Sequence, residues 1–160
     1  MQLETGRFRY LFVLQAFTKI YAVPGIRLGY GISSDKALLE RMETVRQPWS
    51  VSTPAQAAGL SALKEDHREE QTRQLVKSER ERMEKELENL RIEYIPSEAN
   101  FLLFNSEINW FEELKKRGIL IRDCANYRGL GNGWYRMAVR MPEENDRLLE
   151  CMKQVLNERS

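Results

Sequence analysis

The chain of 160 residues carries a formal net charge of +1, with 42% hydrophobic and 31% charged residues. This length is enough for one domain with a sizeable core, and the balanced charge argues against nucleic acid or an anionic membrane as a partner. No apolar run is long enough to cross a bilayer, and we expect no signal peptide. Cys124 and Cys151 form no metal-type cluster, so we expect no metal site and a reducing, cytoplasmic location.

Two short apolar runs, about residues 10–16 and 26–32, predict two strands, with a tight turn at Pro24-Gly25 between them. Lys19 follows the first run and Arg27 lies inside the second, so both cations are expected near the same edge of a sheet. A lysine at the end of a buried strand can be desolvated, which lowers its pKa, and an arginine offers a planar fork to a phosphate. These residues suit an imine-forming cofactor with a phosphate group; the alternative is a solvated lysine without function.

Three helices are predicted next. The first begins after the cap Ser33-Ser34-Asp35, and the second runs from Ala55 to about Leu63 with Pro54 in its first turn. The stretch from Lys64 to Leu90 is charged throughout, with apolar residues at helical intervals, and predicts one long amphipathic helix. The apolar side of the first helix is formed by Ala37, Leu38, Leu39, Met42 and Val45.

Residues 92–160 alternate between strand and helix patterns. They predict a compact α+β domain in which helices cover one face of a sheet of about four strands. The expected strands are Ile92–Ile95, Asn100–Phe104, Ile119–Arg122 and Trp134–Arg140. The expected helices are Trp110–Arg117, which ends at Gly118, and a final helix opened by Pro142 with Leu148, Leu149, Met152, Val155 and Leu156 as its buried stripe.

A glycine-rich loop separates the strands that end at Arg122 and start at Trp134. Arg122 and Arg136 flank this loop on adjacent strands, and Arg128 and Arg140 add positive charge nearby. Arginine pairs are a common means of holding a carboxylate or a phosphate. The alternative is a surface hairpin with scattered arginines.

The run F-T-K-I-Y-A-V-P-G-I-R-L-G-Y resembles the pyridoxal-phosphate lysine motif of aminotransferases with the aspartate-aminotransferase fold. The resemblance implies pyridoxal 5'-phosphate as cofactor, with Lys19 as the catalytic lysine that bonds it. It also implies that Thr18 and Arg27 contact the cofactor phosphate. The family usually has serine or threonine three residues before the lysine, where this chain has Ala16, so one hydrogen bond to that phosphate, on the order of 1.5–3 kcal/mol, is expected to be absent.

The run I-L-I-R-D-C-A-N-Y-R-G-L-G-N-G-W-Y-R-M-A-V-R resembles the C-terminal signature of threonine-phosphate decarboxylases of cobalamin biosynthesis. Histidinol-phosphate aminotransferases share the fold and the lysine motif, so transamination remains an alternative. The resemblance implies a small phosphorylated amino acid as substrate. Arg136 is the first candidate to bind it, Arg122 the second and Arg140 the third. The resemblance also implies a homodimer. A non-catalytic folded fragment or interaction module is the alternative of another class.

The resemblance covers about residues 11–158 and implies an α/β fold. In it, residues 1–63 are part of the large-domain sheet of a fold-type-I pyridoxal-phosphate enzyme, 64–91 form a linking helix, and 92–160 form the small α+β domain. Chains of this family are more than twice as long, so this chain resembles their C-terminal portion. The aspartate that pairs with the cofactor's pyridine nitrogen lies N-terminal to the lysine in the family, so we expect this chain alone to be inactive or nearly so.

Overall fold

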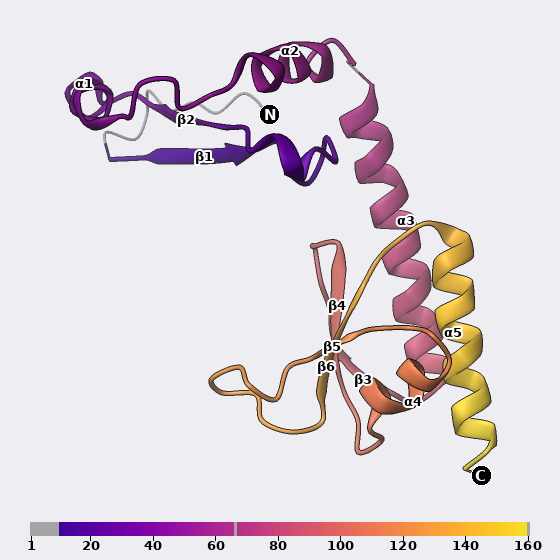
Figure 1. Ribbon diagram of the computed structural model, residues 1–160. Helices are drawn as coiled ribbons and strands as arrows, with labels where there is room; N and C mark the ends of the chain where they lie inside the picture. The colour runs from indigo at the N-terminus through magenta and orange to yellow at the C-terminus, as the bar shows by residue number, and fades with distance from the viewer. Residues whose placement is uncertain (1–9, 66, 160) are drawn as a thin grey trace. The chain divides into compact units, whose positions relative to one another are not determined.

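The computed structural model describes residues 10–65 and 67–159, and the polar N-terminal residues 1–9 lie outside that range. The chain divides into two compact units between residues 69 and 70, within the first turn of a long helix. Figure 1 shows the elements of each unit along the chain. No helix among the described residues is both long and apolar enough to cross a membrane.

The first unit is built on an antiparallel pair of strands, β1 (Phe12–Ala16) and β2 (Gly29–Ser33). Phe12 lies opposite Ser33 and Ala16 lies opposite Gly29. A Cβ atom at Gly31 would lie 2.3 Å from the ring of Phe12, so any larger residue there would push that ring aside. The turn predicted at Pro24-Gly25 is a short 3-10 helix, η2 (Pro24–Ile26).

Two capped helices follow the strands. Helix α1 (Lys36–Val45) begins after Asp35, whose carboxylate accepts from the Leu38 N–H, and α2 (Thr53–Ala62) begins after Ser52, whose hydroxyl accepts from the Ala55 N–H. The predicted burial of this region is wrong. The strands are only half-buried or exposed, and no residue of α1 is buried, because the described part of this unit offers its apolar side no partner layer.

The second unit has the predicted α+β architecture. Its four antiparallel strands, in the order β3-β4-β6-β5, are β3 (Glu93–Ile95), β4 (Phe101–Asn105), β5 (Arg122–Asp123) and β6 (Trp134–Ala138). Its helices are α3 (Arg68–Asn89), which begins in the first unit, α4 (Trp110–Lys116) and α5 (Pro142–Asn157). In Figure 1, α3 and α5 lie side by side, and the Lys153–Glu86 ion pair at 2.6 Å links them.

One face of this sheet forms the core and the other stays open. Leu102 and Phe104 of β4 and Tyr135 and Met137 of β6 are buried, whereas Phe101 and Leu103, which point to the other face of β4, are exposed and half-buried, respectively. The buried strand residues pack in one cluster with helix residues Met83, Leu87, Trp110, Leu114, Leu148, Leu149, Met152 and Val155. The predicted coverage of one face by helices is therefore confirmed.

The predicted strand Ile119–Arg122 is wrong over most of its length, since β5 contains only Arg122 and Asp123. The Ile119 N–H donates to the Leu114 carbonyl at 2.9 Å, and the Gly118 N–H donates to the Lys115 carbonyl at 3.0 Å. These bonds, with Gly118 at φ +74°, close the end of α4. The chain leaves this cap before it can join the sheet, although Ile121 still reaches the core.

Candidate functional site

The loop that carries Lys19 is closed at its base and anchored by aromatic rings. The Phe17 N–H donates to the Leu28 carbonyl at 3.1 Å, which joins the two ends of the loop between β1 and β2. The buried ring of Phe17 stacks on Tyr21 with 4.8 Å between centroids and meets Tyr30 edge-on at 5.9 Å. The Tyr21 hydroxyl donates to the Glu69 carboxylate. The turn with Thr18 and Lys19 at its middle is therefore held on both sides.

Lys19 is exposed and Thr18 is half-buried. The Ala22 N–H donates to the Lys19 carbonyl at 3.0 Å, which fixes the backbone of the turn. The desolvation of Lys19 expected from the sequence is absent, because β1, which precedes it, is itself not buried.

Arg27 ends η2 in a left-handed conformation, with φ 58° and ψ 49°. Such a backbone costs a non-glycine residue about 1 kcal/mol or more, so the surrounding turn must hold it. One guanidinium nitrogen of Arg27 donates to the Pro24 carbonyl at 3.3 Å, and the side chain is exposed. Within the described part of the chain, neither Arg27 nor Lys19 forms an ion pair.

These residues fit a phosphorylated aldehyde by their chemistry. An exposed primary amine can bond a carbonyl carbon, and a guanidinium and a hydroxyl on the same closed loop are donors for a phosphate. Lys19, Thr18 and Arg27 supply these three groups between the two strands of one hairpin. The arrangement is suited to pyridoxal phosphate, whose aldehyde and phosphate need these two kinds of contact.

In the second unit, Arg122 and Arg136 lie directly opposite each other on β5 and β6. Directly opposed residues of antiparallel strands project from the same face, which here is the open face. Like charges in such a pair repel each other, and the described residues offer neither guanidinium an ion pair. A bound anion would relieve this repulsion, so the pair is a candidate anion site.

Arg140 has other contacts. Its Nε donates at 2.7 Å to the carboxylate of Glu144, which lies in the first turn of α5. It lines a different hollow, a pocket of about 400 Å³ between residues 118–121 and the start of α5. Of the three predicted substrate arginines, Arg122 and Arg136 therefore lie opposite each other, whereas Arg140 forms an ion pair with Glu144.

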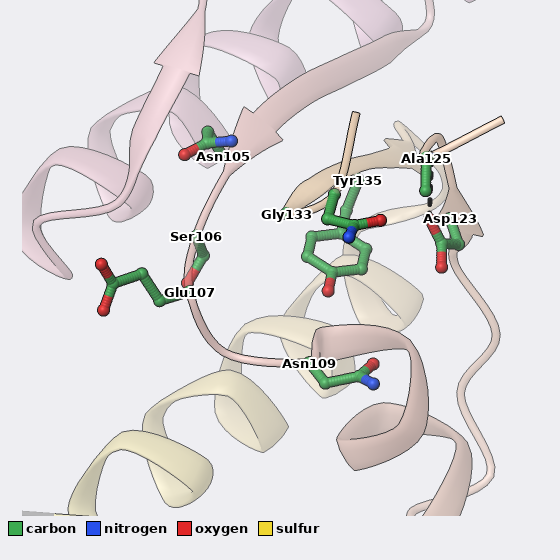
Figure 2. A pocket seen from close by; sticks show the side chains of 9 residues that line it. Asn105, Ser106, Glu107, Asn109, Asp123, Ala125, Gly133 and Tyr135 are labelled. Carbon is green, nitrogen blue, oxygen red and sulfur yellow. Dashed lines mark hydrogen bonds between the residues drawn. The ribbon is translucent and has the colours of Figure 1, made fainter. Parts of the chain in front are cut away.

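A polar pocket of about 520 Å³ was missed by the sequence analysis (Figure 2). It is lined by Asn105, Ser106, Glu107, Asn109, Asp123, Ala125, Asn132, Gly133 and Tyr135. Figure 2 shows Asp123 accepting from the Ala125 N–H, at 2.8 Å. Burial raises the pKa of the Tyr135 hydroxyl, and the negative charge of Asp123 raises it further. The two carboxylates, Glu107 and Asp123, make this pocket unsuited to a phosphate. Polar residues just beyond the ends of strands are the signal that could have found it.

The chain is similar to known proteins over most of its length. Residues 2–151 match the family "Aminotransferase class I and II". The chain is 39% identical over 151 residues to the threonine-phosphate decarboxylase of Salmonella typhimurium, covering 92% of this chain and 42% of that protein. It is 38% identical over 149 residues to the histidinol-phosphate aminotransferase of Symbiobacterium thermophilum, covering 91% and 40%. The chain therefore spans less than half the length of these relatives.

Solved structures give the same result. The histidinol-phosphate aminotransferase from Clostridium acetobutylicum matches with a TM-score of 0.90 and 32% identity, over 97% of this chain and 48% of that one. The L-threonine-O-3-phosphate decarboxylase from Porphyromonas gingivalis matches with a TM-score of 0.80 and 25% identity, over 93% and 47%. The resemblance seen in the lysine motif is confirmed, and with it the aspartate-aminotransferase-like fold: the chain belongs to the class I and II aminotransferase family.

Proposed function

We propose that this chain is the C-terminal part of an L-threonine-O-3-phosphate decarboxylase of cobalamin biosynthesis that uses pyridoxal phosphate. The observation that carries the proposal is the opposed pair Arg122 and Arg136, which suits a substrate with more than one anionic group. The 39% identity to a threonine-phosphate decarboxylase supports the same substrate class. We also propose a cytoplasmic location and a homodimer. Size-exclusion chromatography of a longer protein that includes the preceding coding sequence tests the homodimer.

Lys19 is the proposed catalytic residue. Its amine would bond the cofactor aldehyde, while Thr18 and Arg27 would hold the cofactor phosphate. Pyridoxal phosphate is the cofactor of this family, and when bound it accepts the electron pair released as a bond to the substrate's α-carbon breaks. The Lys19 amine would also act as the general acid that returns a proton to that carbon.

The arginine pair has the proposed role of orienting the substrate. Arg136 and Arg122 bind the carboxylate and the phosphate, and their positions decide which bond at the α-carbon is aligned for cleavage. Loss of the carboxylate gives decarboxylation, and loss of the α-hydrogen gives transamination. Arg140 is not included, because its guanidinium is bonded to Glu144.

Histidinol-phosphate transamination is the second candidate. It is favoured by the 32% identity and TM-score of 0.90 to the Clostridium acetobutylicum histidinol-phosphate aminotransferase. A non-catalytic module is the third, and the exposed apolar side of α1, with Leu38, Leu39 and Met42, favours it, because such a side promotes association.

Three experiments test the proposal. The 160-residue chain is mixed with pyridoxal phosphate and treated with borohydride, and we expect a label on Lys19 that is missing in Lys19→Ala. The same chain with threonine phosphate should release almost no carbon dioxide; brisk release would contradict the expectation that the chain alone is inactive. A longer protein that includes the preceding coding sequence is then offered threonine phosphate and histidinol phosphate. Carbon dioxide from the first substrate supports the decarboxylase, and amino transfer from the second supports the alternative.

A further inference from the structure

Each member of the arginine pair rests against an aromatic ring. The Cζ atom of Arg136 lies 4.9 Å from the ring centroid of Phe101, and that of Arg122 lies 5.7 Å from the ring centroid of Tyr127. Phe101 on β4 is paired with Ala138, so its ring reaches Arg136 diagonally across the β4–β6 ladder. Tyr127 comes from the loop between β5 and β6. Two separate elements therefore supply the two rings.

We propose that Phe101 and Tyr127 are positioning residues that hold the two guanidinium groups ready for an anion. The face of an aromatic ring attracts a cation without neutralising its charge or occupying its N–H donors in the guanidinium plane. A carboxylate in the same place would form an ion pair and compete with the incoming anion. Aromatic contacts therefore fix the arginines while leaving their full charge for the ligand, together with all their donors except the one that Arg122 gives to the Asn126 side chain at 3.4 Å. This inference rests on the proposed function, in which the anion is a phosphorylated amino acid.

The two contacts differ in strength. Arg136 is half-buried and lies nearer to its ring, whereas Arg122 is exposed, lies farther from its ring and has a 3.4 Å hydrogen bond to the Asn126 side chain. Cation–π attraction grows as the pair is desolvated. Phe101 therefore fixes Arg136 as the rigid member of the pair, and Tyr127 leaves Arg122 more freedom to adapt.

The test measures binding of O-phospho-L-threonine to the full chain by calorimetry. Phe101→Leu should weaken binding about 5-fold and Phe101→Tyr should restore it, because tyrosine keeps the ring face. Tyr127→Leu should weaken binding less than Phe101→Leu. Phe111 in α4 provides a matched control. Its ring centroid lies 5.5 Å from the Lys115 ammonium, so it makes a similar cation–π contact, but with a cation outside the proposed anion site. Phe111→Leu should leave binding unchanged.

A second readout needs no ligand. In the wild-type chain the ring current of Phe101 should shift the Nε–H resonance of Arg136, and the shift should disappear in Phe101→Leu and persist in Phe101→Tyr. An unchanged Arg136 resonance in Phe101→Leu would overturn the inference. The inference would also be overturned if Phe101→Leu bound phosphothreonine with wild-type affinity while Arg136→Gln lost binding. Binding that survives both Arg122→Gln and Arg136→Gln would instead refute the proposed function.

Discussion

Asn145 donates a hydrogen bond from its side-chain amide to the Glu79 carboxylate across 2.7 Å, and both side chains are buried in the second unit. The same amide group binds the backbone of Arg140 on both sides: the Asn145 oxygen accepts from the Arg140 N–H at 3.0 Å, and the nitrogen donates to the Arg140 carbonyl at 2.9 Å. Glu79 also accepts two bonds from Arg82, at 3.1 and 2.7 Å. This network ties α3 and α5 to the segment that follows β6, the strand that carries Arg136.

Replacing Glu79 with alanine should lower the free energy of unfolding by about 2–3 kcal/mol, because it leaves a buried N–H of Asn145 without its acceptor. The matched control is Glu81→Ala on the same helix. Glu81 is exposed and lies 4.0 Å from Lys77, so its loss should change stability by no more than about 0.5 kcal/mol. Urea denaturation followed by tryptophan fluorescence measures both. Equal losses in the two variants would show that the network contributes nothing.

The same carboxylate predicts a pH dependence. Hydrogen bonds from Arg82 hold the pKa of Glu79 below its ordinary value, although burial opposes them, and the bond from Asn145 lowers it further. A group whose pKa is depressed on folding adds stability above its unfolded pKa of about 4.3, and that contribution is lost as the pH falls through the folded value. Unfolding midpoints in urea should therefore be level near neutral pH and fall below about pH 4.3. The unfolding midpoint of Glu79→Gln should fall less steeply over that range. Parallel curves of midpoint against pH for the variant and the wild-type chain would show that Glu79 does not cause the pH dependence.

The second unit was largely predictable because its helices and strands have strong periodicity. Leu148, Leu149, Met152 and Val155 of the predicted stripe are buried, whereas Leu156 is only half-buried, and α5 begins at Pro142 as expected. Asn145 was not predicted to be buried, since a polar residue gives no hydrophobic signal and its partner Glu79 is 66 residues away. The shortened β5 was also missed, because the end of α4 uses the N–H of Ile119 before a strand can form.

The sequence predicted which residues form the candidate site but not the contacts or the exposure of all of them. The sequence placed Arg122 and Arg136 on adjacent strands, and the register confirms that they are direct neighbours. It could not show that Arg140 is bonded to Glu144, since this depends on the first turn of α5 bringing Glu144 back over the chain. Nor could it show the exposure of Lys19, because a short apolar run does not reveal whether a second layer covers it.

Because Arg140 is bonded to Glu144, its replacement should affect ligand affinity less than replacement of Arg136. Arg136→Gln should weaken binding of O-phospho-L-threonine about ten-fold or more, because hydrogen bonds to a charged ligand are lost. Arg140→Gln should have a much smaller effect, since its guanidinium is bonded to Glu144 at 2.7 Å rather than opposed to Arg122. Calorimetry on the full chain measures both affinities, and circular dichroism confirms that both variants are folded. A larger loss in Arg140→Gln than in Arg136→Gln would return Arg140 to the substrate site.

Two glycines in the loop between β5 and β6 allow backbone strain to be separated from crowding. Gly129 and Gly133 have φ of +94° and +87°, so alanine at either position must adopt an unfavourable backbone conformation. A Cβ atom at Gly129 meets nothing within 4 Å, whereas at Gly133 it would lie 2.9 Å from the Ser106 carbonyl oxygen. That oxygen belongs to backbone held in place by a 2.9 Å bond from the Ser106 N–H to the Gly133 carbonyl.

We therefore expect Gly129→Ala to lower the free energy of unfolding by about 1 kcal/mol, as for other alanines forced to positive φ, and Gly133→Ala to lower it by about 2–3 kcal/mol. Urea denaturation of the two variants beside the wild-type chain measures the difference. Because the backbone cost is common to both, the excess loss at Gly133 reports the contact with Ser106, which lines the polar pocket together with Gly133. Equal losses at the two positions would mean that the pocket wall moves to accept the methyl group, and that its shape is not fixed by this contact.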